Sequence, residues 1–319
     1  MRTVGFHEFG GPDVLRVIDL PEPHAGPGEV RVRVHAAAVN PADTLVRAGV
    51  HAQALAGVPG PYVPGMEIAG VVDEIGPGTE TPLGIGTPVM AMVQPIGTAA
   101  GGYAEYKVLP AGWVVPAPAG VDHPAAATLP MNGLTALLAL DQLALPPGSV
   151  LAVTGAAGIL GGYLVQLATH LGLVVIADAA PADEPLVRSL GAAEVVARGP
   201  GVTEAILARH PHGVDAIADV ALLGPDLLAA VRDGGRFARF RSAGEPGGYR
   251  TDDLRGITMV APFVPDYAGR TGKLDEIRRL AEADVLTPRL ADTLPAAEAA
   301  EAHRRFEAGG VRGRLVLTF

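Results

Sequence analysis

The sequence predicts an α/β protein in which a doubly wound parallel sheet is combined with a β-rich domain. Its 319 residues suit about two domains. Residues 1–120 alternate apolar and polar side chains between Pro-Gly turns, whereas strand and helix patterns alternate after about Val121. The 42 glycines and 29 prolines follow no period, so they indicate many tight turns.

Short strands separated by turns predict the first part. Residues 30–35 alternate strictly, and residues 68–72 and 88–93 are apolar runs between glycines. No long helical period interrupts them. We therefore expect a compact β domain over residues 1–120.

Alternation of strands and helices predicts the second part. Residues 125–143 are mostly helical, and a strand at 150–153, a helix at 162–171 and a strand at 174–177 follow. Gly172 stands where a helix cap belongs. The alternation continues through 185–190, 193–196, 203–210, 214–219 and 226–231. Two amphipathic helices, 271–284 and 296–308, and a strand at 314–317 end the chain.

Composition excludes several classes of function. The net charge of −10 makes binding of nucleic acid or of an anionic membrane through bulk charge a poor fit. The absence of cysteine rules out disulfides, thiolate nucleophiles, iron–sulfur clusters and cysteine zinc sites. The N-terminus has no apolar run of signal-peptide length, so we expect a cytoplasmic protein. The uncharged stretch 142–177 is broken by prolines and glycines, which favours a buried βαβ unit over a membrane span.

A glycine-rich turn is the strongest local signal of function. Ala156, Gly158 and Gly161 have the spacing of the G-x-G-x-x-G motif, between a predicted strand and a predicted helix. Such a turn lets backbone approach a pyrophosphate at a helix N-terminus. Asp178 follows about twenty residues later, where a carboxylate would bind a ribose. The alternative is a tight turn that binds no ligand.

Motifs spread over the whole chain carry a family resemblance. They are Ala-Ala-Val-Asn-Pro-Ala-Asp at 37–43, Pro-Tyr-Val-Pro-Gly-Met-Glu-Ile-Ala-Gly-Val-Val at 61–72, Gly-Gly-Tyr-Ala-Glu at 101–105, Gly-Leu-Thr-Ala at 133–136, Ser-Leu-Gly-Ala at 189–192, and the ending with His303 and 312–316. In this order and spacing they resemble the zinc-independent quinone oxidoreductase branch of the medium-chain dehydrogenase/reductase superfamily.

The resemblance implies a fold and a reaction. It implies a GroES-like catalytic domain made of residues 1–120 and 263–319, and a Rossmann nucleotide-binding domain at 121–262. It implies an oxidoreductase that transfers hydride from NAD(P)H to a quinone or to an α,β-unsaturated carbonyl (enoyl) substrate. It also implies a homodimer, for which the apolar segment 255–263 would supply the edge strand or else form an ordinary internal strand.

The resemblance also implies site residues. Asn40 would face the nicotinamide, and Thr135 would contact the cofactor near it. The remaining cofactor-binding positions are Gly155, Ala156, Ala157, Gly158, Ile159, Leu160, Ala221, Ser242, Gly244 and Arg314, together with Asp178. Zinc-dependent relatives have a cysteine in the Asn40 loop and Gly-His-Glu where this chain has Gly65-Met66-Glu67, so no metal is expected. His210 and His212 are expected to lie in an exposed turn.

Some residues depart from the family pattern. Leu45 and His51 stand where quinone reductases often have tyrosines. His51 is a candidate proton donor, the alternative being a loop histidine exposed to solvent. The Asn40 amide is a candidate to hold the ribose or a substrate carbonyl, the alternative being a turn residue before a proline. Asp43 is expected to accept backbone N–H groups of its loop. Tyr62 and Tyr103 are expected to pack with a polar tip.

The sequence leaves the cofactor and the substrate open. Asp178 favours NADH, although Ala179 takes the usual acidic position, and residues 179–187 contain no basic side chain. The family favours NADPH, for which Arg188, Arg239 or Arg241 would have to reach the 2′-phosphate. We expect NADPH, with NADH as the alternative. A specialised biosynthetic reductase of a polyketide-type enoyl, ketone or imine intermediate is a second interpretation. A cofactor-binding protein without turnover is a third.

Overall fold

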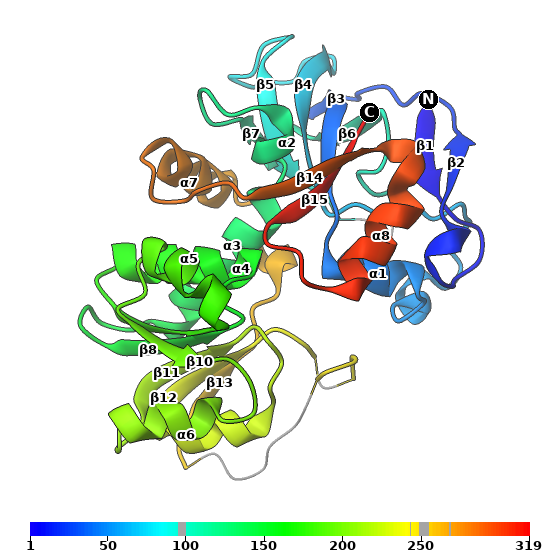
Figure 1. The fold of residues 1–319 in the computed structure, drawn as a ribbon. Coiled ribbons are helices and arrows are strands. Elements are labelled where there is room, and N and C mark those ends of the chain that lie inside the picture. The colour runs from blue at the N-terminus through cyan, green and yellow to red at the C-terminus, as the bar shows by residue number, and fades with distance from the viewer. Residues whose placement is uncertain (95–99, 243, 249–254, 268) are drawn as a thin grey trace. The chain divides into compact units, whose positions relative to one another are not determined.

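The computed structural model describes residues 1–94, 100–242, 244–248, 255–267 and 269–319. These residues form two compact units, one of Met1–Met131 with Pro265–Phe319 and one of Asn132–Val264 (Figure 1). Residues 121–131, which the sequence pattern assigns to the second part, group with the first unit. The reason is helix α2 (His123–Ala126), which packs against strands of the first unit's sheet.

A mostly antiparallel sheet forms the centre of the first unit. Its strands are β3 (Glu29–Ala38), β4 (Glu67–Ile75), β5 (Pro88–Met92), β6 (Tyr106–Pro110), β7 (Val114–Pro116), β14 (Leu290–Pro295) and β15 (Arg314–Thr318). The order is β14-β15-β3-β4-β5-β7, with β6 also paired to β3. Among the named strands of this sheet in the described residues, β14 and β15 are the one parallel pair. The last strand of the chain thereby lies beside β3 (Figure 1). A separate hairpin joins β1 (Arg2–Gly5) to β2 (Arg16–Asp19).

The alternation of apolar and polar residues along β3 places its valines in the core, as the sequence predicts. Val30, Val32 and Val34 point into the core and are at most 2% exposed, whereas Arg33 between them is exposed. Arg31 lies on the same polar face as Arg33 but is almost buried. A charge in that position needs close partners.

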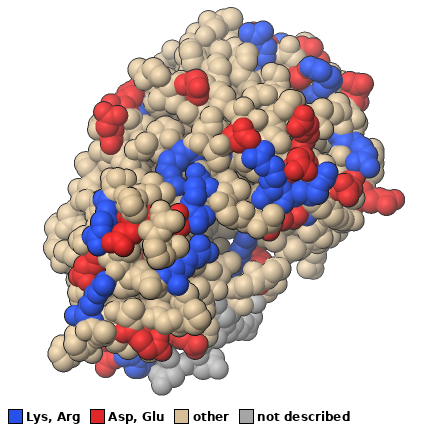
Figure 2. Space-filling view, viewed as in Figure 1, with Lys and Arg blue, Asp and Glu red and all other residues tan. Residues whose placement is uncertain are grey.

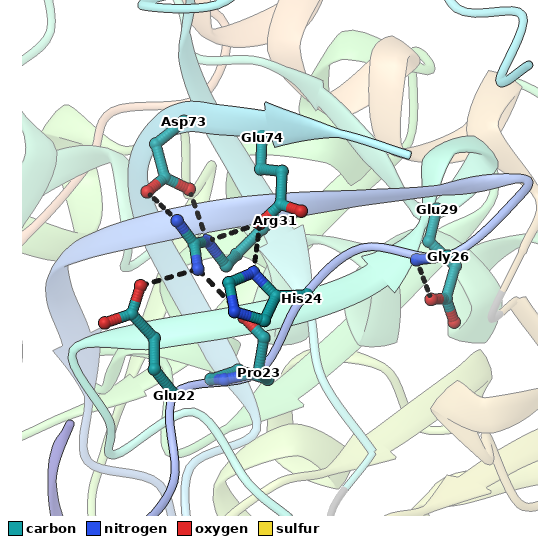
Figure 3. A network of polar contacts seen from close by, with 8 residues as sticks. All are labelled: Glu22, Pro23, His24, Gly26, Glu29, Arg31, Asp73 and Glu74. Atoms are coloured by element: carbon teal, nitrogen blue, oxygen red, sulfur yellow. Dashed lines mark hydrogen bonds and ion pairs between the residues drawn. The ribbon is translucent and has the colours of Figure 1, made fainter. Parts of the chain in front are cut away.

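A cluster of polar contacts surrounds Arg31 (Figure 3). Its guanidinium donates two hydrogen bonds to the Asp73 carboxylate, at 3.0 and 2.9 Å. It also donates to Glu22 Oε1 at 2.7 Å and to the carbonyl of Pro23 at 2.9 Å. The Tyr106 ring lies 4.7 Å from the guanidinium carbon. These contacts fasten the segment that precedes β3 to the edge of β4.

Short helices cover the first unit. They are α1 (Pro41–Arg47), α2, α7 (Thr271–Glu282) and α8 (Ala299–Ala308), with 3-10 turns η1 (Pro12–Val14), η2 (Ala52–Leu55), η3 (Ala111–Trp113), η6 (Val264–Tyr267) and η7 (Ala296–Glu298). The helix expected at 296–308 therefore begins with a 3-10 turn and becomes α-helical only at Ala299.

The second unit is the predicted doubly wound parallel sheet. Its strands are β8 (Val150–Thr154), β9 (Val174–Ala179), β10 (Glu194–Ala197), β11 (Val214–Asp219), β12 (Val231–Arg239) and β13 (Thr258–Val260). All pair in parallel, in the order β10-β9-β8-β11-β12-β13. Counted along the chain this is the Rossmann order 3-2-1-4-5-6, which reverses direction between β8 and β11. Ligands of such sheets bind outside the carboxyl ends of the strands at that reversal.

Helices connect these strands with small departures from the sequence prediction. They are α3 (Pro130–Leu143), α4 (Ile159–His170), α5 (Glu184–Ser189) and α6 (Val202–Arg209), with 3-10 turns η4 (Pro181–Asp183) and η5 (Pro225–Ala230). The helical stretch expected at 125–143 breaks at 127–129, because Pro130 disfavours helical backbone at Leu129 and starts a new helix. The connection at 226–231 is a 3-10 turn instead of an α-helix. Gly172 has the expected left-handed backbone after α4.

The surface in Figure 2 carries charges of both signs lying next to one another between large uncharged areas. Among the described residues, no helix has the length and apolar character that crossing a membrane requires.

Strand β13 pairs only with β12 in the described part of the sheet, so it lies at the edge. The homodimer expected from that edge stays a prediction.

Candidate functional site

The glycine-rich turn joins β8 to α4 as the motif spacing predicts. Gly155 has a φ of +66°, a left-handed conformation that favours glycine, and a Cβ there would lie 3.2 Å from the Ala221 amide nitrogen. Ala156 and Ala157 are buried, and Gly158 is the N-cap of α4. The first N–H groups of α4, from Ile159 and Leu160, have no carbonyl partner within the helix, so the turn ends in a site for an anion.

Gly161 allows the helix to pack closely on the turn. A Cβ at this position would lie 2.2 Å from the carbonyl oxygen of Gly155 and 2.8 Å from the Ala156 Cα. These contacts are with backbone atoms, which cannot move away from an added Cβ as the end of a flexible side chain can. Gly161 therefore has the packing role that its place in the motif indicates.

Asp178 lies directly against this turn. It is the next-to-last residue of β9, and its side chain is 2% exposed. Its Oδ1 accepts a hydrogen bond from the Ala156 amide at 3.2 Å, whereas its Oδ2 is buried with no hydrogen-bond partner among the described residues. Burial raises the pKa of this carboxyl, and the N–H groups of Ala156 and Gly155 oppose the rise. A buried acceptor without a partner is costly, and a hydroxyl of a bound ligand would satisfy it.

Thr154 and Asp219 organise the opposite side of the reversal point. They end β8 and β11, and the Thr154 hydroxyl donates to Asp219 Oδ1 at 2.8 Å. The same hydroxyl oxygen accepts from the Ala221 amide at 3.0 Å. Asp219 also accepts from the amides of Leu223 and Gly224, both at 3.0 Å. Neither residue was among the expected site residues, although polar side chains at the ends of buried strands are a signal that a sequence can show.

These features fit a dinucleotide. A helix N-terminus, a glycine turn without Cβ atoms at close contacts and an unpartnered buried carboxylate oxygen lie at the reversal point of a parallel sheet. Gly155 to Leu160 would hold the pyrophosphate, and Asp178 a ribose hydroxyl. The loop 220–224, which contains Ala221, would flank the ligand with backbone.

Other predicted cofactor positions in this unit are less defined. Thr135 is half-buried on α3. Ser242 and Gly244 are exposed after β12, and the Ser242 amide donates to Glu245 Oε2 at 2.9 Å. Ala243 between them lies outside the described residues.

Asn40 is completely buried in the first unit and is held by a carboxylate. Its Nδ2 donates to Glu67 Oε1 at 2.9 Å, and Glu67 Oε2 accepts from the Met131 amide at 2.7 Å. Because a carboxylate only accepts, this contact fixes which end of the Asn40 amide faces Glu67. The role of Asn40 toward the nicotinamide or the substrate stays a prediction, and its orientation by Glu67 was not expected from the sequence.

Asp43 has the structural role that the sequence predicts. It is buried at the start of α1, and it accepts from the amides of Asn40 at 2.8 Å and Gly65 at 2.9 Å. Burial raises the pKa of this carboxyl to about 7. Arg314, expected at the cofactor, is buried on β15, and its charge lowers that pKa.

His51, the candidate proton donor, is half-buried and directly precedes η2.

Comparison with known proteins agrees with this geometry. A family model described as an alcohol dehydrogenase GroES-like domain matches residues 26–119, and one described as a zinc-binding dehydrogenase matches residues 190–317. A 2-haloacrylate reductase of a Burkholderia species is 31% identical, over 98% of this chain and 97% of that protein. The chain belongs to the medium-chain dehydrogenase/reductase superfamily. It is an oxidoreductase of the zinc-independent quinone oxidoreductase branch, since its sequence has no cysteine for the zinc sites of other members.

Two further proteins are similar to this chain in sequence. The quinone oxidoreductase of Rattus norvegicus is 33% identical over 61% of this chain and 58% of that protein. The spectinabilin polyketide synthase protein NorB of Streptomyces orinoci is 35% identical over 97% of this chain but only 14% of that protein.

Solved structures of the superfamily match over the whole chain. The quinone oxidoreductase of Coxiella burnetii superposes with a TM-score of 0.85 at 27% identity and covers 100% of this chain and 99% of that one. A mycobacterial protein complexed with NADPH has a TM-score of 0.85 at 29% identity and covers both chains completely. An NAD-dependent alcohol dehydrogenase has a TM-score of 0.86 at 31% identity, also over both chains. A pyridine nucleotide is therefore the cofactor of this dehydrogenase family.

No metal-binding group accompanies the fold in the residues that the structure describes. Among them, no three His, Asp or Glu side chains lie where they could hold a metal ion together. His210, one of the two histidines that are close in sequence, contacts Glu194 Oε1 at 3.1 Å, and His212 is exposed in a turn.

Replacing Gly161 tests the packing of the turn. In Gly161→Ala the new Cβ would overlap the Gly155 carbonyl, so we expect a loss of stability of about 1–3 kcal/mol and weaker NADPH binding. Thermal unfolding and a fluorescence titration with NADPH measure the two effects. Gly201→Ala is the control, because a Cβ there meets nothing within 4 Å. Equal behaviour of the two variants would contradict the packing role.

Proposed function

We propose that the protein is a zinc-independent NAD(P)H-dependent reductase that gives hydride to the β-carbon of an α,β-unsaturated carbonyl compound or to a quinone. One observation carries the cofactor part of the proposal: the unpartnered Asp178 Oδ2 is buried beside the glycine turn at the N-terminus of α4. The substrate part is supported by full-length likeness to a 2-haloacrylate reductase and by likeness to quinone oxidoreductases. Their named substrates share an electron-poor conjugated system.

The chain needs few acid–base groups for this reaction. When bound, the reduced nicotinamide supplies the hydride. In an enoyl substrate the hydride forms a C–H bond at the β-carbon, the electrons of the C=C bond move to the carbonyl oxygen, and a proton then joins the α-carbon. The protein therefore has to orient the two reactants and stabilise negative charge on one oxygen. His51 is our candidate for delivering the proton, and a water molecule is the alternative.

Turnover with a small substrate panel tests the proposal. We expect the purified protein to oxidise NADPH in the presence of a 2-haloacrylate, a simple enone or a quinone, followed by loss of nicotinamide absorbance. Tight NADPH binding without oxidation by any member of the panel would contradict the proposal. It would instead favour a cofactor-binding protein without turnover.

A biosynthetic reductase is the second candidate function. It is favoured by the 35% identity to NorB over almost the whole of this chain. An enoyl thioester that mimics a carrier-bound polyketide would then be reduced with a higher kcat/KM than simple quinones. Fast and unselective reduction of quinones would count against it.

Arg198 supports NADPH over NADH in our proposal. Burial raises the pKa of Asp178, and the nearby guanidinium of Arg198 lowers it, so this cation lies within electrostatic range of the predicted ribose site. Arg198 is exposed directly after β10, and its amide donates to the Ala179 carbonyl at 3.0 Å. We infer that Asp178 binds a ribose hydroxyl and that Arg198 binds the 2′-phosphate.

The other arginines are less suitable for this phosphate. Arg188 already pairs with Glu184 at 2.7 Å. Arg239 ends β12, which is separated from β9 by β8 and β11 in the sheet. These two and Arg241 were the arginines expected from the sequence. Arg198 was not expected, because Arg198 follows the third strand of the unit along the chain and not the second.

Dissociation constants of both cofactors test this choice. In Arg198→Gln we expect NADPH to bind about 10-fold to 100-fold more weakly, the loss of one charged hydrogen bond, while NADH binding changes little. Arg188→Gln is the matched control and should keep its NADPH affinity. Tighter binding of NADH than of NADPH by the unmodified protein would contradict the assignment of Arg198 to the 2′-phosphate. An unchanged NADPH affinity in Arg198→Gln would also contradict it.

A further inference from the structure

A row of buried polar side chains runs through the first unit. The Tyr103 hydroxyl lies 3.3 Å from Asp43 Oδ2 and 3.2 Å from His303 Nε2. His303 Nδ1 lies 3.2 Å from Arg47 Nη1. All four side chains are at most 3% exposed. They come from α1, from the residues before β6 and from α8, so the row connects segments up to 260 residues apart, ending at the Arg47–Glu307 ion pair.

The chemistry of the two ends gives the row a direction. Arginine only donates hydrogen bonds, and a carboxylate only accepts them. Arg47 therefore donates to His303 Nδ1, which leaves the imidazole proton on Nε2. That proton points to the Tyr103 oxygen, and the Tyr103 hydroxyl donates to Asp43. One neutral tautomer of His303 satisfies every contact.

The reverse direction is blocked at Arg47. If a proton on Asp43 pointed to Tyr103, the Tyr103 hydroxyl would have to donate to His303 Nε2. The imidazole proton would then lie on Nδ1 and face an arginine N–H, so that two donors would oppose each other. Protonation of His303 is also disfavoured, because burial and then the charge of Arg47 lower its pKa to about 3.

Asp43 is the functional end of this relay, by which we mean Arg47, His303, Tyr103 and Asp43. Its carboxylate holds the amides of Asn40 and Gly65, and so joins the loop of Asn40 to the loop that leads into Glu67. Burial raises the pKa of Asp43 to about 7, and Glu67 of β4 raises it while Arg314 of β15 lowers it. A carboxyl with a pKa near neutrality depends on each remaining donor to stay ionised.

We propose that Tyr103 and His303 are positioning residues, which transmit the donor character of Arg47 to Asp43 and thereby keep its carboxylate bound to Asn40 and Gly65. The hydrogen bonds by which Asp43 joins the Asn40 loop to the Gly65 loop therefore depend on pH in the neutral range. The effect of the relay on catalysis rests on the proposed reductase function, whereas its direction and its effect on stability do not.

The pH dependence of stability tests the relay without any activity. The native chain keeps a proton on Asp43 that the unfolded chain releases between about pH 4 and pH 7, so ionising this group costs stability as the pH rises through that window. Tyr103→Phe removes a donor to the ionised form. We therefore expect its loss of Tm to be at least about twice as large at pH 8 as at pH 5.

Two further variants provide controls. Tyr106→Phe removes a hydroxyl from a half-buried tyrosine of the same unit whose ring contacts Arg31, and its effect should not change with pH. His303→Gln keeps both an amide donor and an oxygen acceptor and should retain the pH dependence of the unmodified protein. His303→Leu should behave like Tyr103→Phe. A pH-independent loss of Tm in Tyr103→Phe, or equal behaviour of the Gln and Leu variants, overturns the proposal.

Nitrogen NMR of the imidazole tests the direction itself. We expect His303, assigned from the signal lost in His303→Gln, to stay neutral with its proton on Nε2 from about pH 5 to pH 8. A proton on Nδ1, or protonation in that range, overturns the relay. In an active enzyme the acidic limb of kcat/KM should move to higher pH in Tyr103→Phe. If the tautomer and stability results hold but no reductase activity exists, the proposed function fails and the relay stands.

Discussion

Buried carboxylates that accept backbone N–H groups are the interaction on which both units depend. Asp43 holds the amides of Asn40 and Gly65, Asp178 that of Ala156, and Asp219 those of Leu223 and Gly224. Glu67 does the same for Met131. Loops at the ends of buried strands have N–H groups that no strand or helix satisfies, and leaving them unpaired would cost more than burying a hydrogen-bonded acid. The loops near each candidate site are therefore fixed by acids that lie at the ends of strands or in the first turn of a helix.

This arrangement separates the structural carboxylates from the one that remains available. Asp43 and Asp219 each accept at least three hydrogen bonds from the chain. Asp178 uses one oxygen for the turn and leaves the other without a partner among the described residues. A reductase that relies on a nicotinamide needs binding groups of this kind more than it needs acids and bases. The motifs accordingly point to the cofactor and do not name the substrate.

Much of the fold could be predicted because its signals are local. Period-two alternation identified β3, the glycine motif identified the β8–α4 turn, and the position of Asp43 in its loop indicated an acceptor of backbone N–H groups. Asn40 shows the limit of such reasoning. Its place in a motif suggested a group that faces the cofactor, but its partner Glu67 is 27 residues away and becomes visible only when β4 is placed beside β3. The relay could not be predicted from the sequence either, because His303 and Tyr103 are 200 residues apart and come together only in the folded first unit.

Deuterium transfer tests the central claim of hydride delivery most directly. NADPH deuterated at the transferable position of C4 would be incubated with the protein and a 2-haloacrylate or an enoyl thioester, and the product analysed by NMR. The account predicts one deuterium at the β-carbon and a solvent-derived proton at the α-carbon. A product with no deuterium at the β-carbon, or unreacted NADPH with both substrates and with a quinone, would contradict it.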